Sequence, residues 1–287
     1  TDDGISRGFD IYQRKTNSSS LSVSRYGSNS IGGGMRFGVP LNEKDTVNFG
    51  LSAENTKLTL YDNSPQRYKD YVNIFGDSNT TLRGDAGWAR DTRDSIIYPT
   101  KGSLQRVFAE VGLPGGSVKY YKLSYQHQWF MPLVRDFTLM LNGEAGYANG
   151  YGGKPLPFFK SFYAGGNTSV RGFKASSLGP KDIDGNALGG NRRLVGNAEV
   201  LFPFPGMKKD QSLRMSLFLD AGSVFGDGDY PDGKYSKISF ADIRYSTGFA
   251  VSWQSPMGPM KFSIAAPLNS KATDRLERFQ FILGSTF

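Results

Sequence analysis

Apolar and polar residues alternate along segments of about ten residues, and this pattern recurs through most of the chain. In residues 137–147, Leu139 and Leu141 lie on one strand face, whereas Asn142 and Glu144 lie on the other. The same split recurs nearer the C-terminus, at 213–221, 244–254, 260–266 and 278–287. An alternation with a period of two predicts β-strands with one apolar and one polar face. The segment length is that of a tilted strand that crosses a membrane.

Further segments complete a predicted set of about twelve strands. They lie at 4–14, 31–41, 46–61, 81–91, 103–112, 118–132 and 192–204. Short connections at 42–45, 134–136, 205–211 and 256–258 alternate with long ones at 15–30, 62–80, 150–191 and 226–240. Short turns at one end and long loops at the other are typical of outer-membrane barrels. We therefore predict an all-β fold, in which residues 1–287 form one transmembrane antiparallel β-barrel domain in a bacterial outer membrane.

The composition agrees with strands that face lipid on one side and water on the other. The chain has 36 Gly, 15 Tyr and 21 Phe, but only 38% hydrophobic residues. Its mean hydropathy of −0.41 fits a barrel, because half of every strand lines a polar lumen. No run approaches the ~18 to 20 apolar residues of a membrane-spanning helix. A soluble sandwich shares this composition, so the segregation of loop lengths is what favours the membrane barrel.

The net charge of +8 favours lipid head groups as partners. Anionic lipids and lipopolysaccharide at the barrel rims suit Lys and Arg residues that are dispersed along the chain. Nucleic acid is not expected, because no basic helix or aromatic cluster accompanies these charges. The chain has no cysteines, which excludes thiolate metal sites. The acidic loop residues lack the dense spacing of a cation site, so we expect no cofactor and no metal.

An enzymatic function is not expected either. A hydrolase typically needs a nucleophile with a histidine base. The only histidine, His127, shares strand parity with Tyr125 and Trp129, which predicts a lipid-facing side chain. The three tryptophans, Trp88, Trp129 and Trp253, are expected to anchor strands at the membrane interfaces.

The longest connection contains a distinctive run of residues. Residues 162–173 read Phe-Tyr-Ala-Gly-Gly-Asn-Thr-Ser-Val-Arg-Gly-Phe, followed by Leu-Gly-Pro at 178–180 and Gly-Gly-Asn at 189–191. Later come Ser-Pro-Met-Gly-Pro-Met-Lys-Phe-Ser at 255–263 and Phe-Gln-Phe-Ile-Leu-Gly-Ser-Thr-Phe at 279–287. In this order the motifs resemble the BamA family of outer-membrane barrels. That family carries Val-Arg-Gly-Phe at the tip of its sixth extracellular loop and ends in an aromatic β-signal.

The resemblance covers essentially the whole chain and implies a function. The chain would be the core barrel of the machinery that folds and inserts β-barrel proteins through a lateral seam. Its partners would be unfolded β-barrel proteins and, mainly through POTRA domains, the lipoproteins of the BAM complex. The family pattern is a sixteen-stranded barrel after several POTRA domains, and segment 4–14 resembles its fifth strand. Whether this length of chain is active alone is left open by the sequence.

The resemblance also assigns two sets of residues. The loop motif comprises Val170, Arg171, Gly172 and Phe173, with Gly165 and Gly166 before it. The C-terminal signal and seam strand comprises Phe279, Phe281, Gly284 and Phe287. We expect the glycines to supply turns and close approach inside the lumen, rather than to be ordinary loop glycines. The terminal aromatic residues also suit simple lipid contact in an aromatic girdle.

Arg171 is the loop residue with the clearest physical role. If the loop folds into the lumen, carboxylates can bind its planar guanidinium in bidentate geometry. Glu199 and Asp220 lie on the inward parity of neighbouring strands, at positions that match the family's acidic partners. We predict that they lock Arg171 in a partly hydrated site, with an interaction of about 1 to 3 kcal/mol. The alternative is that all three are simply hydrated in the lumen.

Two further expectations concern closure and rival functions. An even number of strands predicts that 4–14 pairs with 278–287 to close a smaller barrel.

A passive porin is one alternative function, although the long loop favours a plugged lumen. A related transporter, TamA-like or of the two-partner secretion type, is another, and the run at 162–180 favours the BamA family over it.

Overall fold

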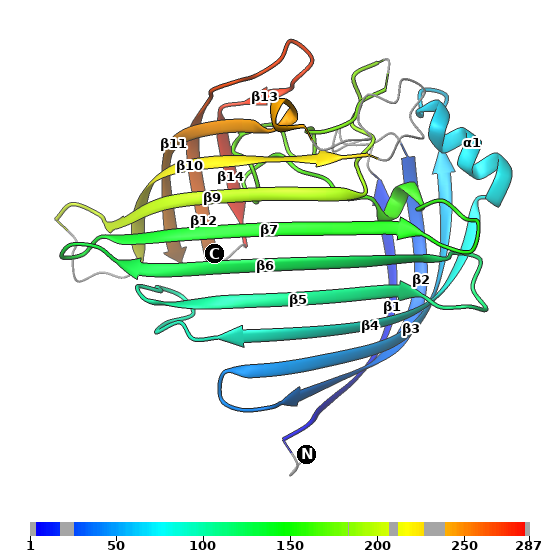
Figure 1. Cartoon of the computed structure of the whole chain (residues 1–287), viewed down its shortest axis with the longest axis horizontal. Helices are drawn as coiled ribbons and strands as arrows, with labels where there is room; N and C mark the ends of the chain where they lie inside the picture. The colour runs from blue at the N-terminus through cyan, green and yellow to red at the C-terminus, as the bar shows by residue number, and fades with distance from the viewer. Residues whose placement is uncertain (1–3, 18–25, 183, 207–211, 227–238, 285–287) are drawn as a thin grey trace.

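The computed structural model describes residues 4–17, 26–182, 184–206, 212–226 and 239–284. Twelve strands form one sheet that follows the order of the chain, and each neighbouring pair is antiparallel (Figure 1). They are β1 (Ser6–Asn17), β2 (Tyr26–Pro40), β3 (Asp45–Leu60), β4 (Ser78–Asp91), β5 (Gly102–Gly112), β6 (Tyr120–Pro132), β7 (Thr138–Gly150), β9 (Arg192–Pro203), β10 (Leu213–Phe225), β11 (Arg244–Ser255), β12 (Gly258–Pro267) and β14 (Phe279–Leu283). Every strand predicted from the alternation is found, with ends shifted by a few residues.

The alternation in the sequence becomes an alternation in burial. Along β10, Leu217 and Leu219 are exposed on the outer face, whereas Phe218 and Asp220 are buried on the concave side. Trp129 is exposed on the outer face in the same way. A wall with an apolar outside and a polar inside is what a membrane barrel requires. No helix in the described ranges is long and apolar enough to span a bilayer.

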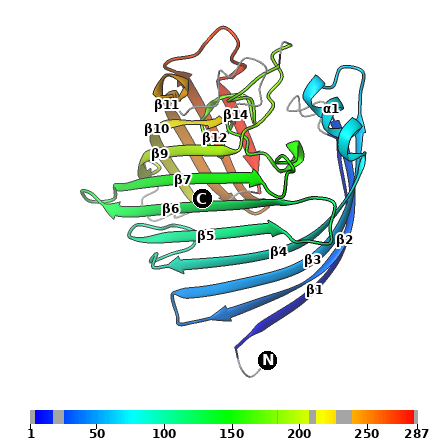
Figure 2. The ribbon, with the colours of Figure 1, turned by 45° about the vertical axis from the view of Figure 1, so that its right-hand side comes forward.

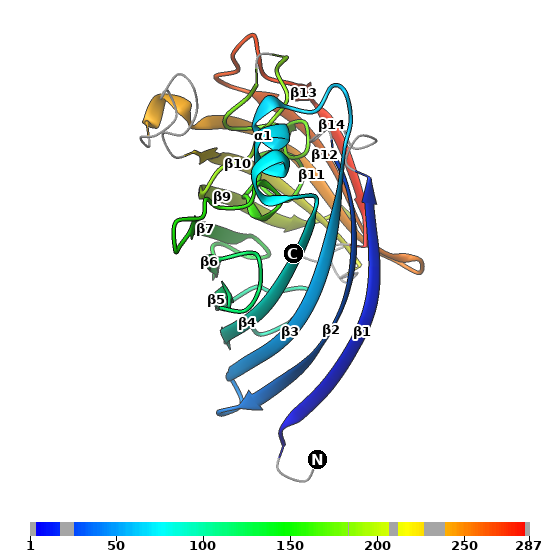
Figure 3. The same cartoon turned by 90° about the vertical axis from the view of Figure 1, so that its right-hand side faces the viewer.

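The predicted closure of the barrel is wrong. β1 and β14 are the two ends of the strand order, and no pairing joins them among the described residues. Figure 2 shows a curved wall with these strands at separate edges, and Figure 3 shows the same curvature from the end. Strand tilt and shear set the radius of a barrel. The twelve strands therefore form an open arc, because their tilt and shear, and not an even strand count, decide whether the two edges meet.

The two ends of the sheet differ as the loop lengths predict, with one addition. The connection after β3 contains a helix, α1 (Gln66–Phe75), which the sequence analysis missed. The apolar positions Tyr68, Tyr71, Val72 and Phe75 have helical spacing, so a signal was present. Tyr68 is fully buried and stacks on Phe158 of the longest loop, with ring centroids 4.0 Å apart.

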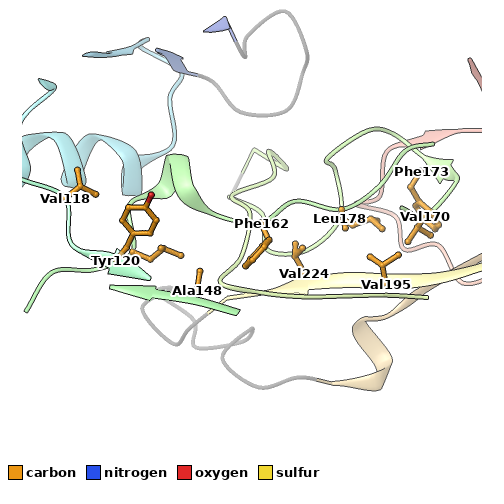
Figure 4. Close-up of a cluster of buried hydrophobic side chains, with 11 residues drawn as sticks. Val118, Tyr120, Ala148, Phe162, Val170, Phe173, Leu178, Val195 and Val224 are labelled. Carbon is orange, nitrogen blue, oxygen red and sulfur yellow. The ribbon is translucent and has the colours of Figure 1, made fainter. Parts of the chain in front are cut away.

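Residues 151–191, here called the arginine loop, fold into the concave side of the sheet. A cluster of buried apolar side chains lies between this loop and the wall (Figure 4). Phe162, Val170 and Leu178 come from the loop, and Tyr120 and Val195 come from the strands. The core of the molecule is therefore the plugged interior. Because these side chains leave water, burial in this cluster holds the loop in place.

Candidate functional site

The site is built around Arg171, which is 2% exposed. Its Nε and Nη2 atoms donate to the two carboxylate oxygens of Asp220 at 2.7 and 2.6 Å. Its backbone N–H also donates to Asp220, at 3.0 Å. The Nη2 atom lies 2.7 Å from Oε1 of Glu199. The structure thus brings together the three residues that the sequence analysis paired, in the bidentate geometry expected of a guanidinium.

Strand register explains why the two acids converge. Glu199 on β9 pairs with Phe218 on β10, and Asp220 pairs with Asn197, so the carboxylates lie on the same face two positions apart. The Phe218 ring lies under the guanidinium, with 3.5 Å between Cζ of Arg171 and the ring centre. A cation above an aromatic face gains a favourable electrostatic contact, which strengthens when water is excluded. The wall therefore supplies two anions and an aromatic platform.

One expectation about this site is wrong. Arg171 was expected to lie in a partly hydrated lumen, but its partners Glu199 and Asp220 are only 3% and 0% exposed. The reason is the apolar packing beside the motif, where Val170 and Phe173 are fully buried and exclude water. The charges therefore meet in a site of low polarity, where both their attraction and the cost of their desolvation are larger.

Two polar neighbours complete the site, and the sequence analysis did not assign them to it. Asn197 donates from Nδ2 to Asp220 at 2.8 Å and to the carbonyl of Ser169 at 2.7 Å. Lys261 of β12 places Nζ 3.4 Å from Oε1 of Glu199. Both lie on the inward parity of their strands. Parity was therefore the available signal, but it could not rank them above other inward polar residues.

The motif glycines have the backbone conformations that the sequence analysis expected. Gly165, Gly166 and Gly172 have φ values of 108°, 90° and 84°. At Gly172 a Cβ atom would also lie 3.0 Å from Cβ of Ala265 on β12. Positive φ and close approach both favour glycine over other residues. Gly172 therefore lets the loop turn directly against the wall.

The arginine loop is also joined to the C-terminal end of the sheet. Its two-residue strand β8 (Gly172–Phe173) pairs antiparallel with β13 (Leu276–Glu277), just before β14. Gln280 of β14 donates from Nε2 to the carbonyl of Phe173 at 2.8 Å. Ser263 of β12 donates to the Asn167 side chain at 2.7 Å. The loop motif and the predicted seam strand therefore form one hydrogen-bonded unit.

A buried ion cluster supports the same junction. Asp274 accepts from Nζ of Lys181 at 3.0 Å and from Nε of Arg244 at 2.6 Å. Burial alone would raise the pKa of Asp274. The backbone N–H of Lys271 and the two cations outweigh it, so this pKa is lowered. The charged form is the one that joins the arginine loop to the connection before β13.

The C-terminal signal residues lie at the edge of the sheet. Phe279 and Phe281 are exposed on the outer face, and the Phe281 ring lies 4.8 Å from that of Phe262 on β12. Gly284 has a φ of 87°, which ends the strand. Phe287 lies outside the described residues. These exposed aromatic side chains lie on the outer face, and their contact with lipid and their role as a signal belong to the function proposed below.

A twelve-stranded wall with apolar exterior and a loop locked into its interior is the architecture of an outer-membrane barrel. The sequence profile of the Omp85 superfamily domain matches residues 1–287. The chain therefore belongs to the Omp85 superfamily. It is an integral protein of the outer membrane.

The similarity to individual proteins is more specific than the match to the superfamily. The chain is 42% identical over its whole length to the outer membrane protein assembly factor BamA of Neisseria meningitidis serogroup B. It is 29% identical over 69% of its length to the human sorting and assembly machinery component 50 homolog. It spans 40% and 44% of these two relatives.

Solved structures agree with the fold. The crystal structure of Haemophilus ducreyi BamA lacking POTRA domains 1–3 superposes with a TM-score of 0.90 at 29% identity. The match covers 100% of this chain and 60% of that one. CdiB from Acinetobacter baumannii gives a TM-score of 0.60 at 14% identity, which is a likeness of fold alone.

Proposed function

We propose that this chain is the membrane barrel of an outer-membrane protein assembly factor, and that it promotes the folding and insertion of β-barrel proteins. The observation that carries the proposal is the 42% identity to the Neisseria meningitidis assembly factor over the entire chain. The buried contact of Arg171 with Asp220 and Glu199 supports it, because the arginine belongs to the loop motif that resembles that of this family. In this proposal the chain carries out no covalent chemistry. It acts as a scaffold and not as an enzyme.

The physical basis of such an activity is strand pairing. Backbone N–H and C=O groups without partners cost several kcal/mol each in hydrocarbon. A client strand that pairs with an edge such as that of β14 satisfies these groups before its own sheet is complete. In this proposal Phe279 and Phe281 keep the edge strand in the lipid phase, while Gln280 holds its inward side to the arginine loop.

The proposed partners follow from this role. They are unfolded β-barrel proteins, the lipids and lipopolysaccharide around the barrel, and lipoproteins of the assembly complex, which bind mainly through POTRA domains. The basic balance of the chain, +8, supports contact with anionic head groups.

A chimera tests the proposal. This chain would replace the matching region of the Neisseria meningitidis assembly factor, in cells depleted of their own copy. We expect growth and normal amounts of folded outer-membrane barrels. Arg171→Ala in the chimera should reduce both. The matched control is Arg193→Ala, which removes another inward arginine, paired with Glu144 at 2.8 Å on the wall.

The decisive unfavourable result is also clear. If the chimera accumulates as a folded, heat-modifiable protein in the outer membrane but barrel assembly stays at the depleted level, the chain is not an assembly barrel. Passive transport would then be examined by conductance. No specific contact in the described residues favours that function, since the arginine loop occupies the interior.

A further inference from the structure

The connection between β4 and β5, residues 92–101, reaches across the concave side of the sheet. Nη1 of Arg214 donates to the carbonyl of Pro99 at 2.7 Å. The Arg214 guanidinium also lies over the Tyr98 ring, with 4.1 Å from Cζ to the ring centre. Arg214 belongs to β10, and three strands separate β5 from β10 in the sheet order. The contact therefore crosses the lumen at its short-turn end.

The connection is built to hold this position. The carboxylate of Asp94 accepts from the backbone N–H groups of Thr100 at 2.9 Å and Lys101 at 3.2 Å. The backbone N–H of Asp94 donates back to the carbonyl of Lys101 at 3.1 Å. The N–H of Tyr98 donates to Oγ of Ser95 at 3.0 Å. These bonds close the segment on itself, so Tyr98 and Pro99 are presented in a fixed orientation.

The space between this segment and the arginine loop is a cavity of about 310 Å³, lined by both polar and apolar side chains. Asn167, Thr168 and Arg171 of the arginine loop line it on one side. Tyr98 and Arg214 line it on the other. The lumen is thus bounded from both directions, by two segments that are far apart in the sequence.

We propose that residues 92–101 form a second plug, which closes the end of the lumen opposite the arginine loop and is held shut by Arg214. Short turns of outer-membrane barrels face the periplasm, so this plug closes the periplasmic end. Its role is to limit access to the interior from that end, independently of the arginine loop. The inference is separate from the proposed assembly function.

The burial of Arg214 distinguishes a plug from an incidental contact. An inward arginine in a wet lumen would keep its guanidinium hydrated, because burying a charge is costly unless it is paired. Arg214 is instead 3% exposed. Its Nε and Nη2 have no hydrogen-bond partner among the described residues. The contact with Tyr98 and Pro99 offsets part of that cost only in the closed position, so loss of this contact should let the segment open.

Cysteine labelling tests this inference, since the chain has no cysteines of its own. Thr168→Cys places one thiol on the cavity wall formed by the arginine loop. Its rate of modification by a charged maleimide is measured for the folded protein in detergent micelles. Arg214→Ala and Tyr98→Ala should each raise this rate about ten-fold, as expected when a cation–π contact and a hydrogen bond that limit local opening are lost. Tyr98→Phe keeps the ring and should leave the rate unchanged.

The control separates the plug from general loosening of the interior. Arg193→Ala removes an inward arginine that bonds to Glu144 and does not touch residues 92–101 in the described structure. It should leave the labelling rate at the parent value. The inference is overturned if Arg214→Ala and Tyr98→Ala label no faster than the parent, or if Arg193→Ala raises the rate equally. Heat-modifiable gel migration checks that each variant is folded.

Discussion

Replacing Arg171 with alanine is the sharpest perturbation of this molecule. The guanidinium makes two side-chain hydrogen bonds to Asp220 and one short contact to Glu199, and all three residues are buried. Alanine would leave two buried carboxylates facing each other. The loop would also lose its backbone bond to Asp220 if it moved away. The change should therefore destabilise the loop and the wall together.

The magnitude follows from the burial and from the neighbours that remain. Removing one partner of a buried ion pair costs about 3 to 5 kcal/mol, because the other charge is left without compensation. Here Asn197 still donates to Asp220, and Lys261 still lies 3.4 Å from Glu199. We therefore expect the lower end, about 3 kcal/mol in the free energy of unfolding. Arg171→Lys should recover only part, since an ammonium lacks the planar fork.

The assay is a double-mutant cycle, with unfolding by urea followed in lipid vesicles. Asp220 accepts the bidentate pair, so Arg171→Ala with Asp220→Asn should show a coupling of about 2 to 3 kcal/mol. Glu199 shares its charge with Lys261, so the coupling with Glu199→Gln should be smaller, about 1 kcal/mol. Strict additivity with both acids would refute the reasoning. Equal coupling would refute the distinction between them.

Three other perturbations give separate expectations. Asp274 has a lowered pKa, so its contribution to stability is fully present above its unfolded pKa of about 3.9 and is lost as the pH falls through its folded pKa. Asp274→Asn should lower the unfolding temperature near pH 7 and flatten its decline below about pH 4. Gly172→Ala should cost more than the about 1 to 2 kcal/mol of a left-handed alanine, because it also meets Ala265. Gly185→Ala, at a φ of 76° with open space around it, is the matched control in the same urea titration. Deleting Phe287 should reduce insertion in cells more than refolding in detergent, and equal losses would reduce it to a lipid contact.

Strand parity is the part of this fold that sequence predicts well. The period of two assigns each residue of a strand to a face without any knowledge of neighbouring strands. For this reason Glu199 and Asp220 could be placed inward before their partner strands were known. The position of the loop arginine could not be predicted in this way, because no periodicity applies to residues 151–191. Its pairing came from the resemblance and from the chemistry of a guanidinium.

The features that the sequence did not predict are mostly contacts between residues that are far apart along the chain. The burial of Arg171 depends on Val170 and Phe173 packing against a wall built from other strands. The contact of Arg214 with Pro99 joins residues 115 positions apart. The prediction of barrel closure was wrong for a related reason, because the radius of a curved sheet depends on all of its strand pairs together. Only α1 was a local feature, and its helical spacing at Tyr68, Tyr71 and Val72 was available in the sequence.

The lock at Arg171 is better understood as a device that fixes one register than as a source of stability. A buried ion pair often contributes less than apolar residues of the same volume would. A slip of the loop by one residue, however, would place Val170 or Gly172 against Asp220 and leave two buried carboxylates without a cation. The next residue, Phe173, accepts the hydrogen bond from Gln280 of β14. Because the same few residues bind the wall and the edge strand, an incorrect register at Arg171 would also remove the bond that holds β14.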